Sequence, residues 1–291
     1  MKKKNFMYAI ISASIFGLMP FMTIVMYNYG CNSLSAVFYR FFYSALVLYA
    51  LALKESKGKL NYTKKELKQL MFLSLNFILT PIFLFASYTY INSGVSTTLH
   101  FLYPVIIAIT HILISHTKVK LNEILSLASA SIGIILLIDI RGEANIYGVV
   151  LAILSAITFA IYSIYFELSG LTKMGSYKLS FFTASSTSLT ALILCLVKGE
   201  FFFVLDKNFI LFSIIYSLLI LFFGILYYQK SIRIIGAKDT SILSTLEPVI
   251  SVFIGTFFLG QKTNLKMLLG VIFIIISAII VLMFNVSKEK A

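Results

Sequence analysis

Charged residues are scarce in this sequence of 291 residues. They make up 12% of the chain, whereas a soluble globular domain carries about a quarter of charged residues to cover its surface. Hydrophobic residues account for 59%, and the mean hydropathy is +0.96. This composition excludes a soluble enzyme, a nucleic-acid-binding module and a disordered chain.

Cysteine and histidine are also few, which limits disulfide and metal chemistry. The two cysteines, Cys31 and Cys195, are too few for a disulfide framework and lack zinc-ligand spacing. His100 and His111 stand eleven residues apart, with no carboxylate at a ligand interval. We therefore expect no metal site and no cofactor.

The local motifs of ATP-driven and hydrolytic proteins are missing as well. No glycine-rich loop is followed by Lys-Ser or Lys-Thr, so direct use of ATP is not expected. Neither His-Glu-x-x-His nor Gly-x-Ser-x-Gly occurs, so intramembrane hydrolysis lacks its usual local signatures.

Long apolar runs dominate what the sequence does contain. A helix needs about 20 mostly apolar residues to cross about 30 Å of hydrocarbon, and these runs are too long for barrel strands, which alternate over about ten residues. The first run follows three lysines, as in a signal peptide, but has no clear cleavage site, so we expect a retained helix. The sequence predicts an all-α membrane protein with ten transmembrane helices, near residues 6–27, 34–53, 67–90, 95–115, 121–139, 146–166, 179–197, 208–229, 239–259 and 265–285.

The basic residues predict how these helices are oriented. With a cytoplasmic N-terminus, 18 of the 24 Lys and Arg residues fall on the cytoplasmic side, 5 fall in outer loops, and Arg40 lies within a span. Lys and Arg are retained on the cytoplasmic side of membranes. We therefore expect a multi-pass protein of the cytoplasmic (plasma) membrane with both termini cytoplasmic. The lysine-rich loop at 54–68 then serves as a topology determinant beside lipid headgroups, and no nucleic-acid partner is expected.

The chain also repeats itself. Residues 9–17 and 152–160 are identical at five of nine positions, and Leu102-Tyr-Pro-Val-Ile106 matches Leu246-Glu-Pro-Val-Ile250 at nearly the same offset. These matches predict two five-helix halves, 1–143 and 144–291. Because five is odd, the halves would be inverted relative to each other. Inverted repeats are a common construction of secondary transporters, in which two halves enclose a midplane site and expose it to each side in turn.

The spans, the repeat, Arg40-Phe41 in the second helix and Leu246-Glu247-Pro248-Val249 in the ninth together resemble the drug/metabolite transporter superfamily, in its EamA-type branch. The resemblance implies a central cavity enclosed by helices 1–4 and 6–9, with the fifth and tenth peripheral. Many members of that branch export amino acids or other small metabolites. This chain departs from the family in having no tryptophan, and in placing Gln261 and Lys262 where an acidic residue often follows the ninth helix. Both departures leave the substrate open.

Glu247 is the strongest candidate for a functional side chain, because ionisable groups within spans are costly. It lies about eight residues, roughly 12 Å, from the cytoplasmic end of its helix. Pro248 has no N–H for the Ser244 carbonyl, so the helix is expected to kink there. The carboxylate can bind a cation, a proton or a substrate ammonium, or instead lock two helices together. In the inverted mate, Tyr103 and Pro104 occupy the corresponding positions.

Arg40 and the two span histidines are further candidates. The Arg40 guanidinium can clamp a substrate carboxylate through two hydrogen bonds, or brace helix-end carbonyls. His100 lies one turn from Tyr103 and either lines the cavity or packs within it. His111 is nearer the cytoplasmic end.

The remaining candidates are aromatic or polar side chains and prolines in the helices of the implied cavity. Aromatic faces attract organic cations by about 0.5–2 kcal/mol each. The candidate lining residues are Tyr39, Tyr43, Tyr88, Tyr103, Tyr162 and Asn76, and the expected helix kinks are at Pro20, Pro81, Pro104 and Pro248.

We therefore expect a secondary active transporter that exports an amino acid or a related zwitterion or amine by alternating access. Glu247 would take the ammonium group or a coupled proton, and Arg40 the carboxylate. Two alternatives stay open: uptake of an organic cation such as a quaternary amine, and a lipid flippase or non-transporting membrane enzyme. The expected partners are a small-molecule substrate, a proton or other coupling ion, and the lipid bilayer, with a homodimer also open.

Overall fold

The computed structural model describes residues 3–91, 93–115, 121–137, 145–259 and 265–287. Every regular element in these residues is helical, which confirms the all-α class. The α-helices are α1 (Lys3–Phe16), α2 (Met19–Asn28), α3 (Ser33–Glu55), α4 (Lys64–Ser87), α5 (Ser93–His100), α6 (Tyr103–Ser115), α7 (Leu121–Leu137), α8 (Ile146–Leu168), α9 (Ser176–Lys198), α10 (Lys207–Leu219), α11 (Leu226–Ser244), α12 (Glu247–Leu259) and α13 (Leu265–Ser287). A 3-10 helix, η1 (Leu171–Lys173), and a π-helix, η2 (Ile220–Ile225), complete them.

Within the described residues, six helical stretches are long and apolar enough to cross a membrane: Phe6–Asn28, Ser33–Glu55, Lys64–Ser87, Ile146–Leu168, Ser176–Lys198 and Lys207–Ile254. Shorter apolar helices lie at Val95–His111, Ile124–Leu136 and Leu265–Ile280. The chain is therefore a multi-pass membrane protein. The count of ten crossings stays a prediction.

Polar caps fix where several of these apolar helices begin. The Asn32 side chain accepts a hydrogen bond from the backbone N–H of Ser35 and starts α3. Thr63 and Glu66 form a reciprocal capping box at the start of α4, and Asp206 caps α10. Such caps satisfy N–H groups that have no partner in the first helical turn.

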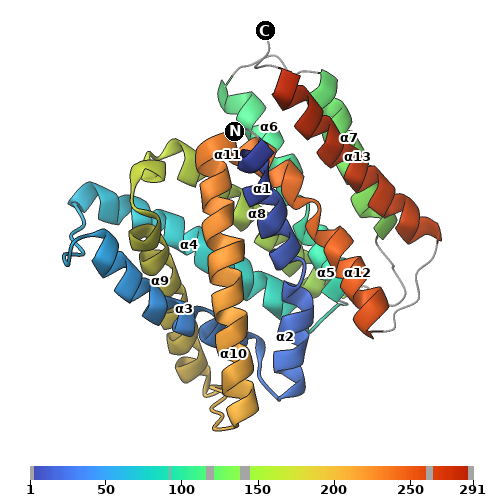
Figure 1. Cartoon of the computed structure of the whole chain (residues 1–291). Helices are drawn as coiled ribbons and strands as arrows, with labels where there is room; N and C mark the ends of the chain where they lie inside the picture. The colour runs from blue at the N-terminus through green and yellow to red at the C-terminus, as the bar shows by residue number, and fades with distance from the viewer. Residues whose placement is uncertain (1–2, 92, 116–120, 138–144, 260–264, 288–291) are drawn as a thin grey trace.

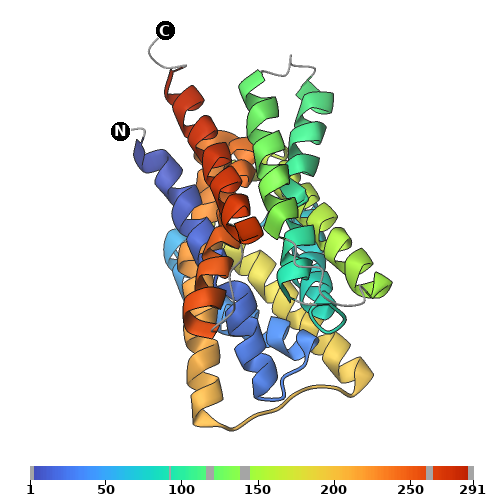
Figure 2. The same cartoon turned by 90° about the vertical axis from the view of Figure 1, so that its right-hand side faces the viewer.

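The helices pack in pairs that join distant parts of the chain. α3 packs along α9, α4 along α8, and α1 along η2 and α11. α7 and α13 pack against each other at the edge of the molecule (Figure 1). α1 begins and α13 ends at the same end of the molecule, hereafter the terminal end (Figure 2).

Three interruptions divide otherwise continuous helices near the middle of the molecule. They separate α1 from α2 at residues 17–18, α5 from α6 at 101–102, and α11 from α12 at 245–246. Pro20, Pro104 and Pro248 are each the second residue of the helix that follows. A proline fits there because the first turn of a helix does not use its N–H groups. Pro81 instead lies inside α4, which continues past it.

Candidate functional site

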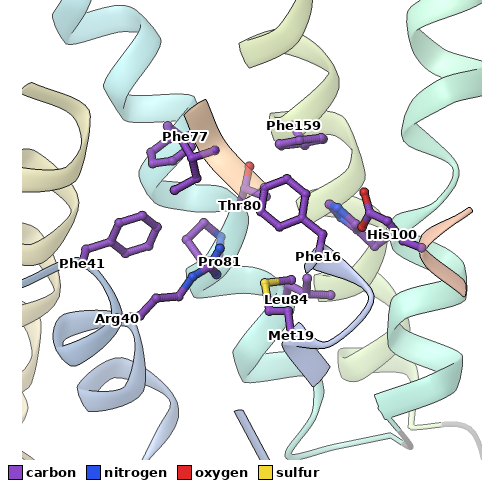
Figure 3. Close-up of a pocket in the computed structure, with 12 residues that line it drawn as sticks. Phe16, Met19, Arg40, Phe41, Phe77, Thr80, Pro81, Leu84, His100 and Phe159 are labelled. Atoms are coloured by element: carbon purple, nitrogen blue, oxygen red, sulfur yellow. The ribbon is translucent and has the colours of Figure 1, made fainter. Parts of the chain in front are cut away.

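A small cavity lies where the interrupted helices meet α3, α4 and α8. It is lined by Phe16, Met19, Arg40, Phe41, Phe77, Thr80, Pro81, Leu84, His100, Phe159, Ile225 and Glu247. Figure 3 shows Arg40 and His100 reaching it from opposite sides, with Phe16 and Pro81 between them. Its volume is about 50 Å³. That is room for a few water molecules, whereas pockets for small organic ligands measure about 300–1,000 Å³. In this conformation the cavity is therefore closed to a ligand of that size.

The interruption before α12 brings Glu247 to this cavity, and Gly17 allows the close approach. A Cβ on Gly17 would lie 2.7 Å from the Glu247 carbonyl oxygen and 2.7 Å from the Cβ of Ile250. The Ser251 hydroxyl donates a hydrogen bond to the Gly17 carbonyl at 2.8 Å. The α1–α2 interruption is therefore packed directly on the backbone that carries Glu247.

Arg40 lines the cavity with a buried guanidinium that has few polar neighbours. Its guanidinium carbon lies 4.9 Å from the ring centroid of Phe41, 5.5 Å from that of Phe85 and 6.0 Å from that of Tyr216. Its Nε has no hydrogen-bond partner in the described part of the chain. Aromatic faces stabilise such a cation, but they do not satisfy its N–H donors. These donors are available to a ligand.

The backbone of Arg40 is held by two buried hydroxyl groups from α3 and α10. The Ser217 hydroxyl donates to the Arg40 carbonyl and accepts from the backbone N–H of Ser44 at 2.9 Å. The Ser44 hydroxyl donates in turn to the Ser217 carbonyl at 2.9 Å. This interlock fixes the turn of α3 that presents Arg40.

Glu247 is the acidic side chain among the described residues that line the cavity. The Tyr103 hydroxyl lies close to its carboxyl group and to Ser244, but makes no hydrogen bond of acceptable geometry within the described residues. No ion pair between Arg40 and Glu247 is found among the described residues. The cavity thus offers a carboxyl group and a guanidinium that are not paired by direct contact.

His100 lines the same cavity, and its ring is positioned by its neighbours. Its Nδ1 is 2.9 Å from the Ser155 hydroxyl. The ring lies 5.2 Å from that of Tyr103 and 5.5 Å from that of Phe159, between centroids.

The other candidate side chains lie outside this cavity. Tyr39 donates to the Phe202 carbonyl at 2.9 Å, and Tyr43 stacks on Tyr39. Asn76 donates to the Phe72 carbonyl in its own helix.

Two further tyrosines and one histidine are held elsewhere. Tyr88 pairs with Thr97 at 3.3 Å, and Tyr162 accepts from Gln229 at 3.1 Å. His111 is half-buried, with its Nε2 3.2 Å from the Glu167 carboxylate.

Sequence reasoning missed the phenylalanines of the cavity, although a signal was present. Phe16 and Phe159 are the matched aromatic residues of the two repeated segments, and both line the cavity. Phe41 and Phe77 complete the aromatic lining, and their rings meet at 5.5 Å. No comparable mark in the sequence distinguishes these two from the other phenylalanines of the chain.

In the described part of the chain, no group of three or more His, Cys, Asp or Glu side chains is placed to hold a metal ion. The cavity instead combines one carboxylate, one guanidinium and aromatic walls. Such a set binds small organic solutes through charge and π-faces.

Solved structures show the same fold. A crystal structure of a protein superposes with a TM-score of 0.77 at 13% identity, covering 97% of this chain and 98% of the other. The superposition therefore relates the two folds over nearly their whole lengths.

Sequence comparisons agree with this fold. An uncharacterized transporter of Bacillus subtilis is 23% identical over 275 residues, which are 91% of this chain and 85% of that protein. An uncharacterized transporter of Archaeoglobus fulgidus is 23% identical over 191 residues, which are 65% of this chain and 67% of that protein. The model of the EamA-like transporter family matches twice, at residues 3–139 and 146–283. Because these two matches span nearly the whole sequence, the chain belongs to the EamA-like transporter family.

Proposed function

We propose that the protein is a secondary active transporter that moves a small zwitterionic metabolite, such as an amino acid, by alternating access. The observation that carries this proposal is the cavity in which Arg40 and Glu247 face the same enclosed space without pairing. A zwitterion brings a carboxylate for the guanidinium and an ammonium for the carboxylate. Each buried charge then gains a partner, which offsets the cost of holding it away from water.

The scaffold of the proposal is two inverted repeats, residues 1–143 and 144–291, with ten crossings and both termini in the cytoplasm. Helix packing supports it. α1 packs on the eighth expected span, where the Ser12 hydroxyl donates to the Gly224 carbonyl at 2.9 Å. Its counterpart α8 packs on α4, where Thr80 and Thr158 meet at 2.9 Å. An axis relating the halves would exchange these two pairs, as in transporters built from inverted repeats.

The closed cavity supports alternating access. A volume of about 50 Å³ admits no metabolite, so the helices around it must separate toward one end to load it. The helix interruptions at residues 17–18, 101–102 and 245–246 are places where half-helices can tilt. We propose that export is the working direction, because the resemblance to metabolite exporters covers the whole chain.

A second candidate substrate is an organic cation such as a quaternary amine. It is favoured by the four phenylalanines in the lining, Phe16, Phe41, Phe77 and Phe159. Aromatic rings bind cations that have no N–H group to donate. In this case Glu247 balances the ligand charge, and Arg40 makes no contact with the ligand.

Flux into proteoliposomes tests the proposal. Purified protein is reconstituted, and uptake of radiolabelled amino acids and quaternary amines is followed under imposed proton and potential gradients, against protein-free liposomes. Saturable uptake of an amino acid supports the proposal, and uptake of quaternary amines alone supports the second candidate. Movement of fluorescent lipid between leaflets without any solute flux would identify a flippase instead.

Thiol labelling tests the topology. Cysteines are introduced as Lys59→Cys and Leu205→Cys, at exposed positions, in a chain whose buried Cys31 and Cys195 are replaced by alanine. Five expected spans separate the two positions, so a membrane-impermeant maleimide should label Leu205→Cys from outside intact cells and Lys59→Cys only in inverted vesicles. Labelling of both from the same side would contradict the inverted arrangement.

A further inference from the structure

Arg233 lies on α11 and is not among the residues that line the cavity. Three residues earlier on α11, the Lys230 ammonium lies 4.1 Å from the ring centroid of Tyr8, near the start of α1, which places this part of α11 toward the terminal end. Its Nη1 donates to the Met174 carbonyl at 2.8 Å, and its guanidinium carbon lies 5.5 Å from the ring centroid of Phe166. Its Nε and Nη2 are buried and have no hydrogen-bond partner within the described residues.

The two unpartnered nitrogens are the pair that forms the side-on edge of a guanidinium. Their N–H bonds run parallel, at the spacing of the two oxygens of a carboxylate, so this edge binds a carboxylate through two charge-assisted hydrogen bonds. A buried donor without a partner is costly. The satisfied Nη1 and the Phe166 ring hold this edge in place, ready for an anion.

The Glu55 and Glu167 carboxylates are engaged with other groups. Glu55 accepts a hydrogen bond from the backbone N–H of Lys178 at 2.9 Å. Glu167 lies 3.2 Å from His111 and accepts from the backbone N–H of Ala237 at 3.2 Å. No salt bridge to Arg233 is found in the described part of the chain, and Glu55 interacts with it only at longer range. The edge itself is therefore available to another anion.

A line of contacts joins Arg233 to the cavity. Gln229, one turn earlier on α11, donates to the Tyr162 hydroxyl at 3.1 Å. The Tyr162 ring lies 5.0 Å from that of Phe77 and 5.9 Å from that of Phe159, and both phenylalanines line the cavity. Arg233 thus stands on the terminal side of the cavity, one aromatic layer away from it.

We propose that Arg233 forms a second carboxylate-binding subsite, which receives the carboxylate of the solute when the transporter opens toward the terminal end. Arg40 holds that group in the cavity, and Arg233 holds it on the way between the cavity and the terminal side. In the conformation described, the Phe166 ring lies against the guanidinium of this subsite. The inference rests on the proposed function, because it needs a solute that carries a carboxylate.

Chemical modification tests the subsite in the unaltered chain. The sequence has only three arginines, Arg40, Arg141 and Arg233, so phenylglyoxal adducts are readily assigned by peptide mass spectrometry. Acetate should slow modification of Arg233 saturably, by about threefold at twice its dissociation constant, while methylammonium chloride at equal ionic strength should not. Equal rates in the two salts overturn the inference. So does an Arg233 that stays unmodified while Arg141 reacts fully, because the subsite must open.

Substitutions then test its part in transport. Arg233→Gln should raise the half-saturation concentration of a zwitterionic substrate about tenfold or more from the terminal side, and leave that from the opposite side unchanged. Lys230→Gln removes an exposed charge three residues earlier on α11 and should have no such effect. Arg233→Lys keeps the positive charge but loses the pair of parallel N–H donors, so its half-saturation concentration should resemble that of Arg233→Gln. Wild-type values for Arg233→Lys, or the same defect in Glu55→Gln, would overturn the inference in favour of an ion pair within the chain.

The two proposals fail in distinguishable ways. If the wild-type protein moves no solute, the proposed function fails, whatever the modification experiment shows. If the wild-type moves a zwitterion and Arg233→Gln behaves as Lys230→Gln does from both sides, only the subsite fails. Where Arg233→Gln does not yield folded protein, the acetate experiment on the unaltered chain decides.

Discussion

Glu247→Gln is expected to lower transport about 100-fold in kcat/KM, a loss of about 2.8 kcal/mol. Glu247 is the acidic side chain among the described residues that line the cavity. Glutamine keeps its size but neither carries a negative charge nor takes up a proton. A substrate ammonium or a coupled proton therefore loses its binding group. The measurement is initial flux into proteoliposomes over a range of substrate concentrations and pH.

The same substitution should leave the fold intact. No ion pair to the Glu247 carboxyl group is found among the described residues, so glutamine of the same size breaks no salt bridge. We expect an unchanged or higher melting temperature in detergent. Glu167→Gln is the matched control, because Glu167 lies outside the cavity with His111. Wild-type flux and pH dependence in Glu247→Gln would remove this carboxylate from the mechanism.

Adding Arg40→Gln to the comparison separates the two substrate classes. For a zwitterion, Arg40 and Glu247 each bind one end, so both single variants lose transport. For a quaternary amine, only Glu247 opposes a ligand charge. Arg40→Gln then retains flux, or gains it, because a repelling cation has been removed from the cavity.

The fold class and the family could be predicted from the sequence because they depend on composition and long-range pattern. A mean hydropathy of +0.96 means that the chain has too few polar residues to cover the surface of a soluble protein. The match of the family model confirms the family that Arg40-Phe41 and Leu246-Glu247-Pro248-Val249 resemble. Because the fold class and the family each depend on many residues, a misinterpreted residue does not change either conclusion.

The sequence predicted kinks at Pro20, Pro104 and Pro248, but not that the helices end just before these prolines. Apolar runs predict a first span at 6–27, and the structure has an apolar helical stretch at Phe6–Asn28. Within it, α1 ends at Phe16 and α2 starts at Met19. A proline two residues into a helix and a proline in the middle of one look alike in sequence. Tertiary packing decides between them, here through the contact of Gly17 with the backbone of Glu247. Pro81, which lies inside α4, shows the other outcome.

The candidate site residues also divide into those that the sequence could predict and those that it could not. Arg40, Glu247 and His100 were singled out because ionisable groups in spans are costly, and the structure brings all three to one cavity. The tyrosines were chosen as aromatic residues in the helices of the cavity that the family resemblance implies. Tyr39 and Tyr162 instead satisfy their hydroxyls on Phe202 and Gln229. A tyrosine needs a partner for its hydroxyl when buried, and the sequence does not say whether that partner is a ligand or the protein.

Gly17→Ala is expected to destabilise the protein and to reduce transport together. The added Cβ would meet the Glu247 carbonyl oxygen at 2.7 Å and the Ile250 Cβ at 2.7 Å. A backbone atom cannot swing away, so α12 must shift, at a cost of about 1–3 kcal/mol for overpacking. Moving α12 also moves Glu247, so flux should fall with stability. Thermal unfolding in detergent and proteoliposome flux measure the two effects.

Gly224→Ala is the matched comparison, because its added Cβ meets a side chain instead of the backbone. The nearest atoms belong to the Phe16 ring, at 2.9 to 3.3 Å, and Phe16 lines the cavity. The ring can rotate away, at the expense of cavity space, so we expect a smaller loss of stability and a clear rise in the half-saturation concentration. If Gly17→Ala instead keeps both the wild-type melting temperature and the wild-type flux, then the backbone of α12 is free to move at this contact. Glu247 would then be placed by its own helix, without the support of the α1–α2 interruption.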